Sequence, residues 1–183
     1  MPTRRFQFFS ALLLSMAVPN HGFATETKSI DLGKLGQASV TAEDEDGARL
    51  LFQLPNGKTQ KETGLGEEFL PFRFGDVGET RIEARDLDGD GQEEVVVRTK
   101  LAGSSAGALY VFRWRQESGR FEPATGEEED DFLYVSAAAP VAVDKTGLIG
   151  VKEEKTTLAY QLKGDRFLLK PAAKSLPAAG ALP

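Results

Sequence analysis

One nine-residue stretch, from Asp86 to Glu94, constrains this chain more than any other. Asp86, Asp88 and Asp90 alternate with other residues, and Gly91 follows directly. In a loop with this alternation the acidic side chains point inward, and the glycine permits the sharp turn that closes the loop. Three carboxylates gathered at one point repel one another unless a cation lies among them. The spacing therefore predicts a loop that binds a divalent metal ion.

The remainder of the loop extends the set of candidate ligands. Gln92 stands at the seventh position, where the usual ligand is a backbone carbonyl, and Glu94 at the ninth supplies a fourth carboxylate. Calcium takes about six to eight oxygen ligands, which four carboxylates, one carbonyl and water can supply. The alternative is an ordinary turn, since Asp and Gly are common turn residues. We predict a Ca²⁺ site with these ligands: Asp86, Asp88, Asp90, Gln92 and Glu94.

The segments that flank the loop indicate its type. Thr80, Ile82 and Ala84 alternate with charged residues before the loop, and Val95–Val97 follow it, so both flanks are predicted strands. An EF-hand would instead need flanking helices and a glutamate at the twelfth position, which is Val97. The strand–loop–strand sequence DLDGDGQEEVVV resembles the calcium loops of FG-GAP and VCBS-type repeats, which occur in integrin-like propellers and exported bacterial proteins. The motif occurs once, which excludes a full propeller of such repeats.

The first 24 residues have the pattern of a secretory signal peptide. Arg4 and Arg5 precede a mostly apolar stretch over residues 6–18, and the small residues Gly22 and Ala24 stand before the predicted cleavage point. The apolar stretch is shorter than a membrane-spanning helix requires. We therefore predict cleavage after Ala24 and a periplasmic or secreted protein; an uncleaved membrane anchor is the alternative.

Cleavage would leave an acidic chain that contains neither histidine nor cysteine. Arg4 and Arg5 would be removed, so 20 of the 22 basic residues would remain against 28 acidic ones, a net charge of −8. This charge disfavours nucleic acids and anionic membranes as partners, because both attract lysine and arginine. The only histidine, His21, would also be lost, which excludes Ser-His-Asp and Cys-His catalysis and His/Cys zinc sites. A pair of carboxylates, as in glycoside hydrolases, remains the available hydrolytic mechanism.

Short alternating segments separated by Gly, Asn and Asp predict an all-β fold from residue 25 to residue 170. Tyr110, Phe112 and Trp114 share one face of a strand and predict an aromatic block in the core. Residues 63–78 are predicted to form an ordered loop or short edge strand, and the acidic run at 127–131 a solvated loop. We expect antiparallel hairpins in a single propeller-like or sandwich-like domain. An Ala/Pro-rich tail at 171–183 is predicted to be disordered.

A second resemblance concerns the Gly/Ser-rich segment that follows the metal loop. Envelope proteins related to the invertebrate-type lysozyme inhibitors carry an SGxxY pattern, and residues 106–110 match its Gly and Tyr. Alanine stands at the serine position, and Ser105 lies one place early. The resemblance implies a partner-binding loop that includes Ser105, Gly107 and Tyr110. Strand alternation supports the competing interpretation, in which Tyr110 is a core residue.

These patterns favour an exported, non-enzymatic calcium-binding protein that acts as a binding or recognition module in the cell envelope. The recognition role is implied by the resemblance to FG-GAP and VCBS-type repeats. The first alternative is a periplasmic inhibitor of a lysozyme-like peptidoglycan hydrolase, a basic partner that would suit an acidic chain. The second alternative is a glycoside hydrolase that uses a carboxylate pair.

Overall fold

The computed structural model describes residues 27–43, 47–74, 79–126, 130–144, 146–152 and 156–170. The predicted signal peptide and the predicted C-terminal tail lie outside these residues. The described elements are, in order, β1 (Thr27–Asp31), η1 (Gly33–Leu35), β2 (Gln37–Glu43), β3 (Gly47–Gln53), β4 (Thr59–Glu62), β5 (Glu68–Phe69), β6 (Phe72–Phe74), β7 (Glu79–Thr80), β8 (Ile82–Arg85), β9 (Glu94–Lys100), β10 (Ala106–Arg115), β11 (Arg120–Pro123), β12 (Leu133–Ser136), β13 (Val141–Val143), β14 (Ile149–Lys152), β15 (Thr157–Lys163) and β16 (Arg166–Lys170). The predicted all-β fold class is confirmed. Within these ranges no helix is long and apolar enough to cross a membrane.

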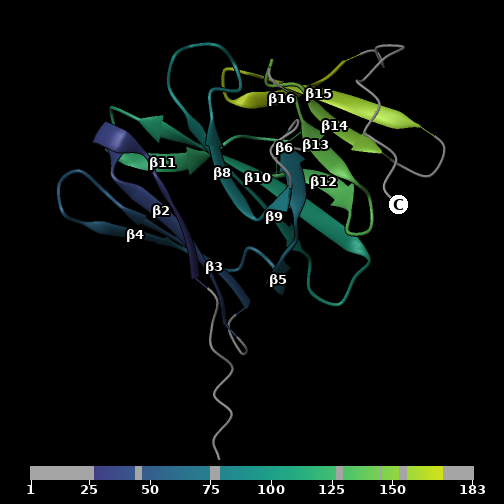
Figure 1. Ribbon diagram of the computed structural model, residues 1–183, viewed down its shortest axis with the longest axis horizontal. Coiled ribbons are helices and arrows are strands. Elements are labelled where there is room, and N and C mark those ends of the chain that lie inside the picture. Colours follow the sequence, from purple (N-terminus) through teal and green to yellow (C-terminus); the bar gives the residue numbers. More distant parts are fainter. Residues whose placement is uncertain are drawn as a thin grey trace, which may run out of the picture.

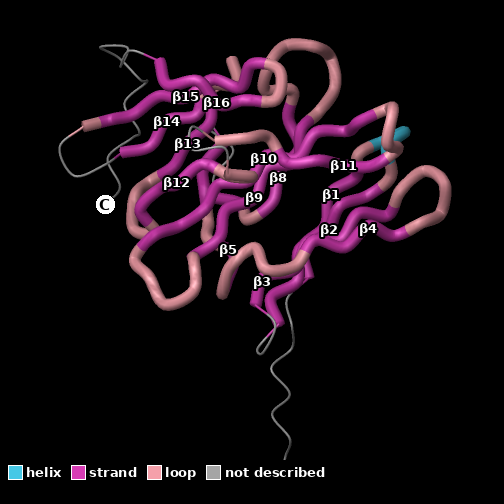
Figure 2. Tube along the Cα trace, turned by 180° about the vertical axis from the view of Figure 1, so that it is seen from behind, coloured by secondary structure: helices cyan, strands magenta, loops and turns pink. Residues whose placement is uncertain are grey.

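The strands form three sheets (Figures 1 and 2). The N-terminal sheet has the order β1-β2-β3-β4. The central sheet has the order β11-β10-β9-β5, with β12 also paired to β10 and β8 to β9. The C-terminal sheet has the order β16-β15-β14-β13-β6-β7. Paired strands run antiparallel, as predicted, except that β13 and β6 are parallel.

The central sheet is covered on both faces, because β9 and β10 contribute to two separate cores. Val96, Leu109 and Val111 pack in a core with residues of the C-terminal sheet. Val95 and Phe112, from the opposite faces of the same two strands, pack in a core with residues of the N-terminal sheet. Burial on both faces explains why the Val95–Val97 run is continuously apolar instead of alternating.

The predicted aromatic block lies in the core shared with the N-terminal sheet. Phe112 and Tyr110 are 1% and 5% exposed, and Trp114 packs against the same core. The ring of Phe52 stacks on that of Phe121, with 4.3 Å between the ring centroids. It meets the ring of Phe112 edge-on, with 5.5 Å between the centroids. Tyr110, Phe112 and Trp114 therefore share a core-facing side of β10, as the alternation predicted.

The segment at 63–78 differs in part from its prediction. The strand β5 is a short edge strand beside β9, as expected, and Phe69 and Phe72 are buried. By contrast, β6 lies inside the C-terminal sheet, between β13 and β7. A three-residue strand shows no detectable alternation, so its place in the sheet depends on partners distant in the sequence. Residues 75–78 lie outside the described part of the chain.

Candidate metal centre

The predicted loop connects β8 to β9, and Arg85 and Glu94 form the last paired position before it. Leu87, in the middle of the first three loop residues, is 1% exposed and packs in the core beneath the C-terminal sheet. This contact anchors the start of the loop, and Asp86 and Asp88 on either side remain half-buried. The predicted strand–loop–strand arrangement is confirmed.

Three of the predicted ligands come together in space. Asp86, Asp88 and Glu94 each place a carboxylate oxygen within 4.8 Å of the other two, and this acidic triad could hold a metal ion. Asp90 is not a member of the triad. Its carboxylate accepts hydrogen bonds from the Gln92 amide (2.8 Å) and from Arg113 (3.0 Å). Gln92 itself is exposed. The structure therefore supports part of the predicted ligand set.

Asp86 is held by the backbone of its own loop. Its Oδ1 accepts hydrogen bonds from the amides of Gly89 (2.7 Å) and Asp90 (3.2 Å), and its Oδ2 accepts one from Gly91 (3.0 Å). Gly91 has a φ of 87°, a left-handed conformation in which a side chain would be strained. Amide donors directed at one carboxylate fix the shape of the loop before any ligand binds.

Glu94 is the buried member of the triad, at 1% exposed. Its Oε2 accepts a hydrogen bond from the Leu87 amide (2.8 Å), and its Oε1 accepts one from Nε of Arg113 (3.1 Å). Burial raises the pKa of Glu94, although these two hydrogen bonds oppose the shift. The side chain therefore ties β9, the loop and β10 together at one point.

Arg113 belongs to this site, although no sequence pattern connected it with the loop. Its guanidinium lies 2.8 Å from Asp88, 3.0 Å from Asp90 and 3.1 Å from Glu94. On its other side it donates to the carbonyl of Gly164 and lies 3.3 Å from Asp165, in the β15–β16 turn. Desolvation opposes its charge, yet the bond to Glu94 and the charges of Asp88, Glu94 and Asp90 outweigh this and raise the pKa of Arg113. The chain thus supplies one cation to the acidic loop from within.

The position of Arg113 in β10 explains why it was missed. It lies on the same face as Leu109 and Val111, opposite Tyr110 and Phe112, and only 9% of it is exposed. Strand alternation predicted a core-facing side for Tyr110, Phe112 and Trp114, and it indicated nothing about what lies against the other side. An arginine directly following the run from Ala108 to Phe112 was the available signal, because a strand so apolar is buried on both faces.

Arg113 does not neutralise the loop. Asp86, Asp88, Asp90 and Glu94 together bring four carboxylates against one guanidinium. Each carboxylate oxygen already accepts a hydrogen bond from the loop or from Arg113, and all of them except Oδ1 of Asp86, which accepts two, keep a second lone pair for a further partner. The excess of negative charge and the oxygen donors fit a hard divalent cation.

The three residues of the predicted partner-binding loop lie in different environments. Ser105 is exposed at the end of the Gly/Ser loop. Gly107 is buried inside β10, paired to both Lys100 and Val135. Tyr110 is buried, and its hydroxyl donates a hydrogen bond to the carbonyl of Leu65 (3.1 Å). Neither Gly107 nor Tyr110 lies on the protruding loop that the inhibitor hypothesis requires.

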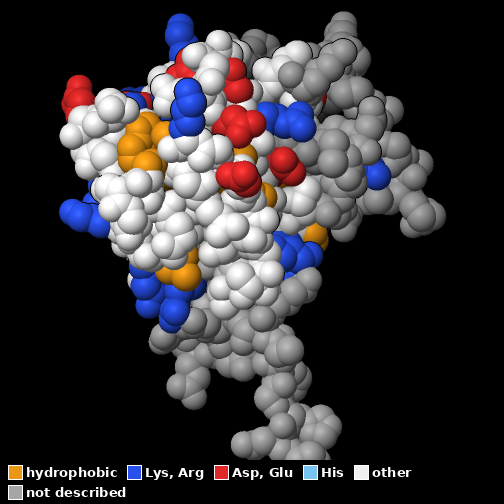
Figure 3. All heavy atoms as spheres, turned by 60° about the vertical axis from the view of Figure 1, so that its left-hand side comes forward, with side chains coloured by type: hydrophobic (Ala, Val, Ile, Leu, Met, Phe, Trp, Pro, Cys, Tyr) orange, Lys and Arg blue, Asp and Glu red, His pale blue; other side chains and the backbone are white. Residues whose placement is uncertain are grey.

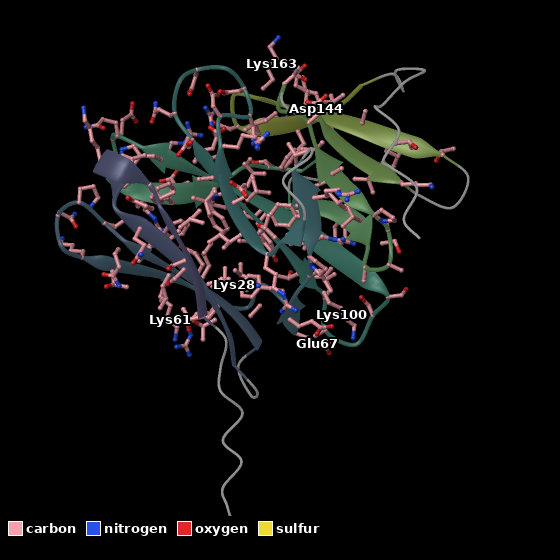
Figure 4. The ribbon with its side chains drawn as sticks, in the orientation of Figure 1. Lys28, Lys61, Glu67, Lys100, Asp144 and Lys163 are labelled. Carbon is pink, nitrogen blue, oxygen red and sulfur yellow. The ribbon has the colours of Figure 1, made fainter. Side chains whose placement is uncertain are left out.

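The Gly/Ser loop itself is held at its base by Glu67 (Figure 4). This carboxylate accepts a hydrogen bond from the Gly103 amide (2.9 Å) and lies 3.2 Å from the Lys100 ammonium. The hydrogen bond from Gly103 and then the charge of Lys100 lower the pKa of Glu67. The loop is therefore a supported connection between β9 and β10.

The fold and the site together define an all-β protein of three sheets with an acidic cluster, able to hold a metal ion, between two strands. No family model, no curated protein and no solved structure matches the chain.

Proposed function

We propose that this chain is an exported, non-enzymatic binding module that takes Ca²⁺ in the 86–94 loop. One observation carries the proposal: three carboxylate oxygens, from Asp86, Asp88 and Glu94, gather within 4.8 Å, and the guanidinium of Arg113 pairs with two of these three residues. Such a cluster attracts a second cation, and its oxygen donors match the preference of calcium. The resemblance of the loop sequence to FG-GAP and VCBS-type repeats supports calcium over other divalent ions.

In this proposal Asp86, Asp88 and Glu94 hold the ion, and Arg113 shares Asp88 and Glu94 with it. Calcium would supply a double positive charge that draws the ends of β8 and β9 together. Arg113 keeps the carboxylates close together before the ion binds, but it also competes with the ion for Asp88 and Glu94. Extracellular modules bind calcium at about 10⁻⁴–10⁻³ M, and a built-in competitor is consistent with affinity in that range.

The absence of histidine and cysteine from residues 25–183 supports the non-enzymatic part of the proposal. The acidic composition supports a basic protein of the cell envelope as the partner, because opposite charges speed association and favour the complex. Recognition of such a partner, with the metal loop in a supporting structural role, is the function that we assign.

Isothermal titration of the protein with Ca²⁺ and, separately, Mg²⁺ tests the metal site directly. We expect Ca²⁺ to bind with millimolar or better affinity, and Asp88→Asn, which removes one charge without changing shape, to weaken binding at least tenfold. Glu117→Gln is the matched control, because Glu117 is exposed in the β10–β11 turn, outside the cluster. Absence of any heat of Ca²⁺ binding at millimolar concentrations would refute the proposal.

A further inference from the structure

A hollow of about 210 Å³ lies on the side of β10 opposite Arg113. It is bounded by the segment after β4, by β10 and by the residues before β12. Aromatic and apolar side chains line much of it, and two carboxylates join them. The lining residues used below are Glu62, Leu65, Tyr110, Phe112, Asp131 and Phe132.

The aromatic part of the hollow continues outward to the surface. The ring of Phe132 lies 5.2 Å from that of Tyr110 and 4.6 Å from that of Tyr134. Phe132 is half-buried, whereas Tyr134 is 50% exposed. The hydrogen bond from Tyr110 to Leu65 fixes the inner ring. A series of aromatic rings thus leads from the core of the protein to solvent beside the hollow.

The charged part of the hollow is acidic, since the described residues that line it include two carboxylates and no lysine, arginine or histidine. Glu62 accepts hydrogen bonds from Gln60 (2.7 Å) and Arg120 (3.4 Å), so its charge is partly balanced. Asp131 is exposed, and no described residue donates a hydrogen bond or forms an ion pair to it. Asp131 is therefore available to a ligand that brings its own positive charge.

We propose that this hollow binds an arginine side chain presented by a basic protein partner. A guanidinium is planar, so it can lie against an aromatic ring and donate two hydrogen bonds to a carboxylate at once. The apolar stem of arginine would contact Leu65 and Phe132, and its head would pair with Asp131. The net charge of the chain, −6, would attract a basic partner over longer distances. The hollow is independent of the metal loop, because Tyr110 and Arg113 point to opposite faces of β10.

Few large hydrophobic side chains are exposed on the described part of the protein surface. Tyr134 and Leu168 are the exposed large hydrophobic residues of the described chain, and Tyr134 adjoins the hollow through its contact with Phe132. On the face of the molecule in Figure 3, acidic and basic side chains are interspersed and the exposed hydrophobic areas are small. With Tyr134 the exposed large hydrophobic residue that adjoins the hollow, a charged partner suits the hollow better than an extended apolar one.

The test uses an N-acetylated hexa-arginine peptide as the probe, with EDTA present, at physiological ionic strength. Fluorescence anisotropy of the labelled peptide measures its dissociation constant for the wild type, Asp131→Asn and Phe132→Leu. We expect each variant to weaken binding by about two- to fivefold, the range of an exposed cation–π contact or ion pair. Hexa-lysine should bind more weakly than hexa-arginine, because an ammonium cannot stack on a ring or form a two-bond pair.

Glu117→Gln is the control for unspecific attraction to an acidic protein, since it removes the same charge outside the hollow. Equal losses in Asp131→Asn and Glu117→Gln, or unchanged binding by Phe132→Leu, would overturn the proposal. If Phe132→Leu lowers the melting temperature, Tyr134→Ser replaces it, because that side chain is half exposed and the same loss is expected. Tighter binding of an uncharged oligosaccharide than of the peptide would also overturn it.

The EDTA in this experiment separates the two proposals. Loss of calcium binding would leave the hollow intact, and failure of the peptide to bind would leave the calcium titration unaffected.

Discussion

The guanidinium of Arg113 lies 3.1 Å from the carboxylate of Glu94, and the two residues are only 9% and 1% exposed. The pair joins β10 to β9 at the edge of the acidic loop and extends through Gly164 to the β15–β16 turn. Removal of one partner from such a buried pair leaves the other without compensation. The stability of the loop therefore depends on Arg113 whenever no metal is bound.

Replacement of Arg113 by methionine tests this dependence. Without Ca²⁺, Arg113→Met should lower the free energy of unfolding by about 3–5 kcal/mol, because Asp88 and Glu94 lose their buried cation. Millimolar Ca²⁺ should restore more stability to this variant than it adds to the wild type, and should bind it more tightly. Urea unfolding with and without Ca²⁺ measures both effects. Arg120→Met is the control, since the Arg120 side chain is 53% exposed. An identical effect of Ca²⁺ on wild type and Arg113→Met would show that the guanidinium does not compete for the site.

Calcium should raise the stability of the wild type by a modest amount. With a dissociation constant near 10⁻⁴ M, 1 mM Ca²⁺ adds about 1.4 kcal/mol to the free energy of unfolding. Calorimetric melting should record the corresponding upward shift, and the tenfold weaker binding expected of Asp88→Asn should reduce the gain to about 0.4 kcal/mol or less. A shift of equal size in Asp88→Asn would place the ion elsewhere in the molecule.

Tyr110 should ionise later than an exposed tyrosine. Burial, and secondarily the charge of Asp131, raises the pKa of Tyr110 to about 12 from its ordinary value of 10.0. The folded state therefore holds this proton more tightly than the unfolded state. The contribution of Tyr110 to the free energy of unfolding is fully present below pH 10. It is lost as the pH rises from 10 through 12. Tyrosinate absorbance during alkaline titration measures the shift, and Tyr110→Phe should remove the late step. Ionisation of Tyr110 together with the half-exposed Tyr134 would contradict the prediction.

Gly147 should be far less tolerant of substitution than a comparable glycine in an open turn. A Cβ at Gly147 would lie 2.2 Å from the carbonyl oxygen of Leu87, and its φ of 79° is unfavourable for a side chain. Gly119 has a φ of 64° but no atom within 4 Å of an added Cβ. Gly119→Ala should thus cost about 1 kcal/mol, and Gly147→Ala a further 1–3 kcal/mol, because it displaces the metal loop as well. Urea unfolding of the two variants compares them, and equal losses would mean that Gly147 does not support the loop.

The predicted signal peptide has a direct chemical test. Mass spectrometry of protein recovered from the producing cells should give a chain that starts at Thr25, because Gly22 and Ala24 match the small residues at a cleavage site. Recovery of the intact chain from a membrane fraction would favour the uncleaved anchor.

Local patterns in the chain were sufficient to predict the features that depend on near neighbours. The alternation of Tyr110, Phe112 and Trp114 predicted a shared core face, and the spacing of Asp86, Asp88 and Gly91 predicted a tight acidic loop between strands. Both results follow from backbone geometry, since successive strand side chains alternate and a loop closed by its own amides has few accessible shapes.

Only the tertiary structure determined which basic side chain of the chain pairs with the carboxylates of the loop. Arg113 stands 19 residues from Glu94, 25 from Asp88 and 52 from Asp165, and no periodic signal connects positions so far apart. The same applies to the hollow, where Tyr110 meets Leu65 across 45 residues of sequence. Strand periodicity specifies which side of a strand a residue occupies. Sheet pairing and packing determine what lies opposite that side, and for Arg113 they place Glu94 and the β15–β16 turn there.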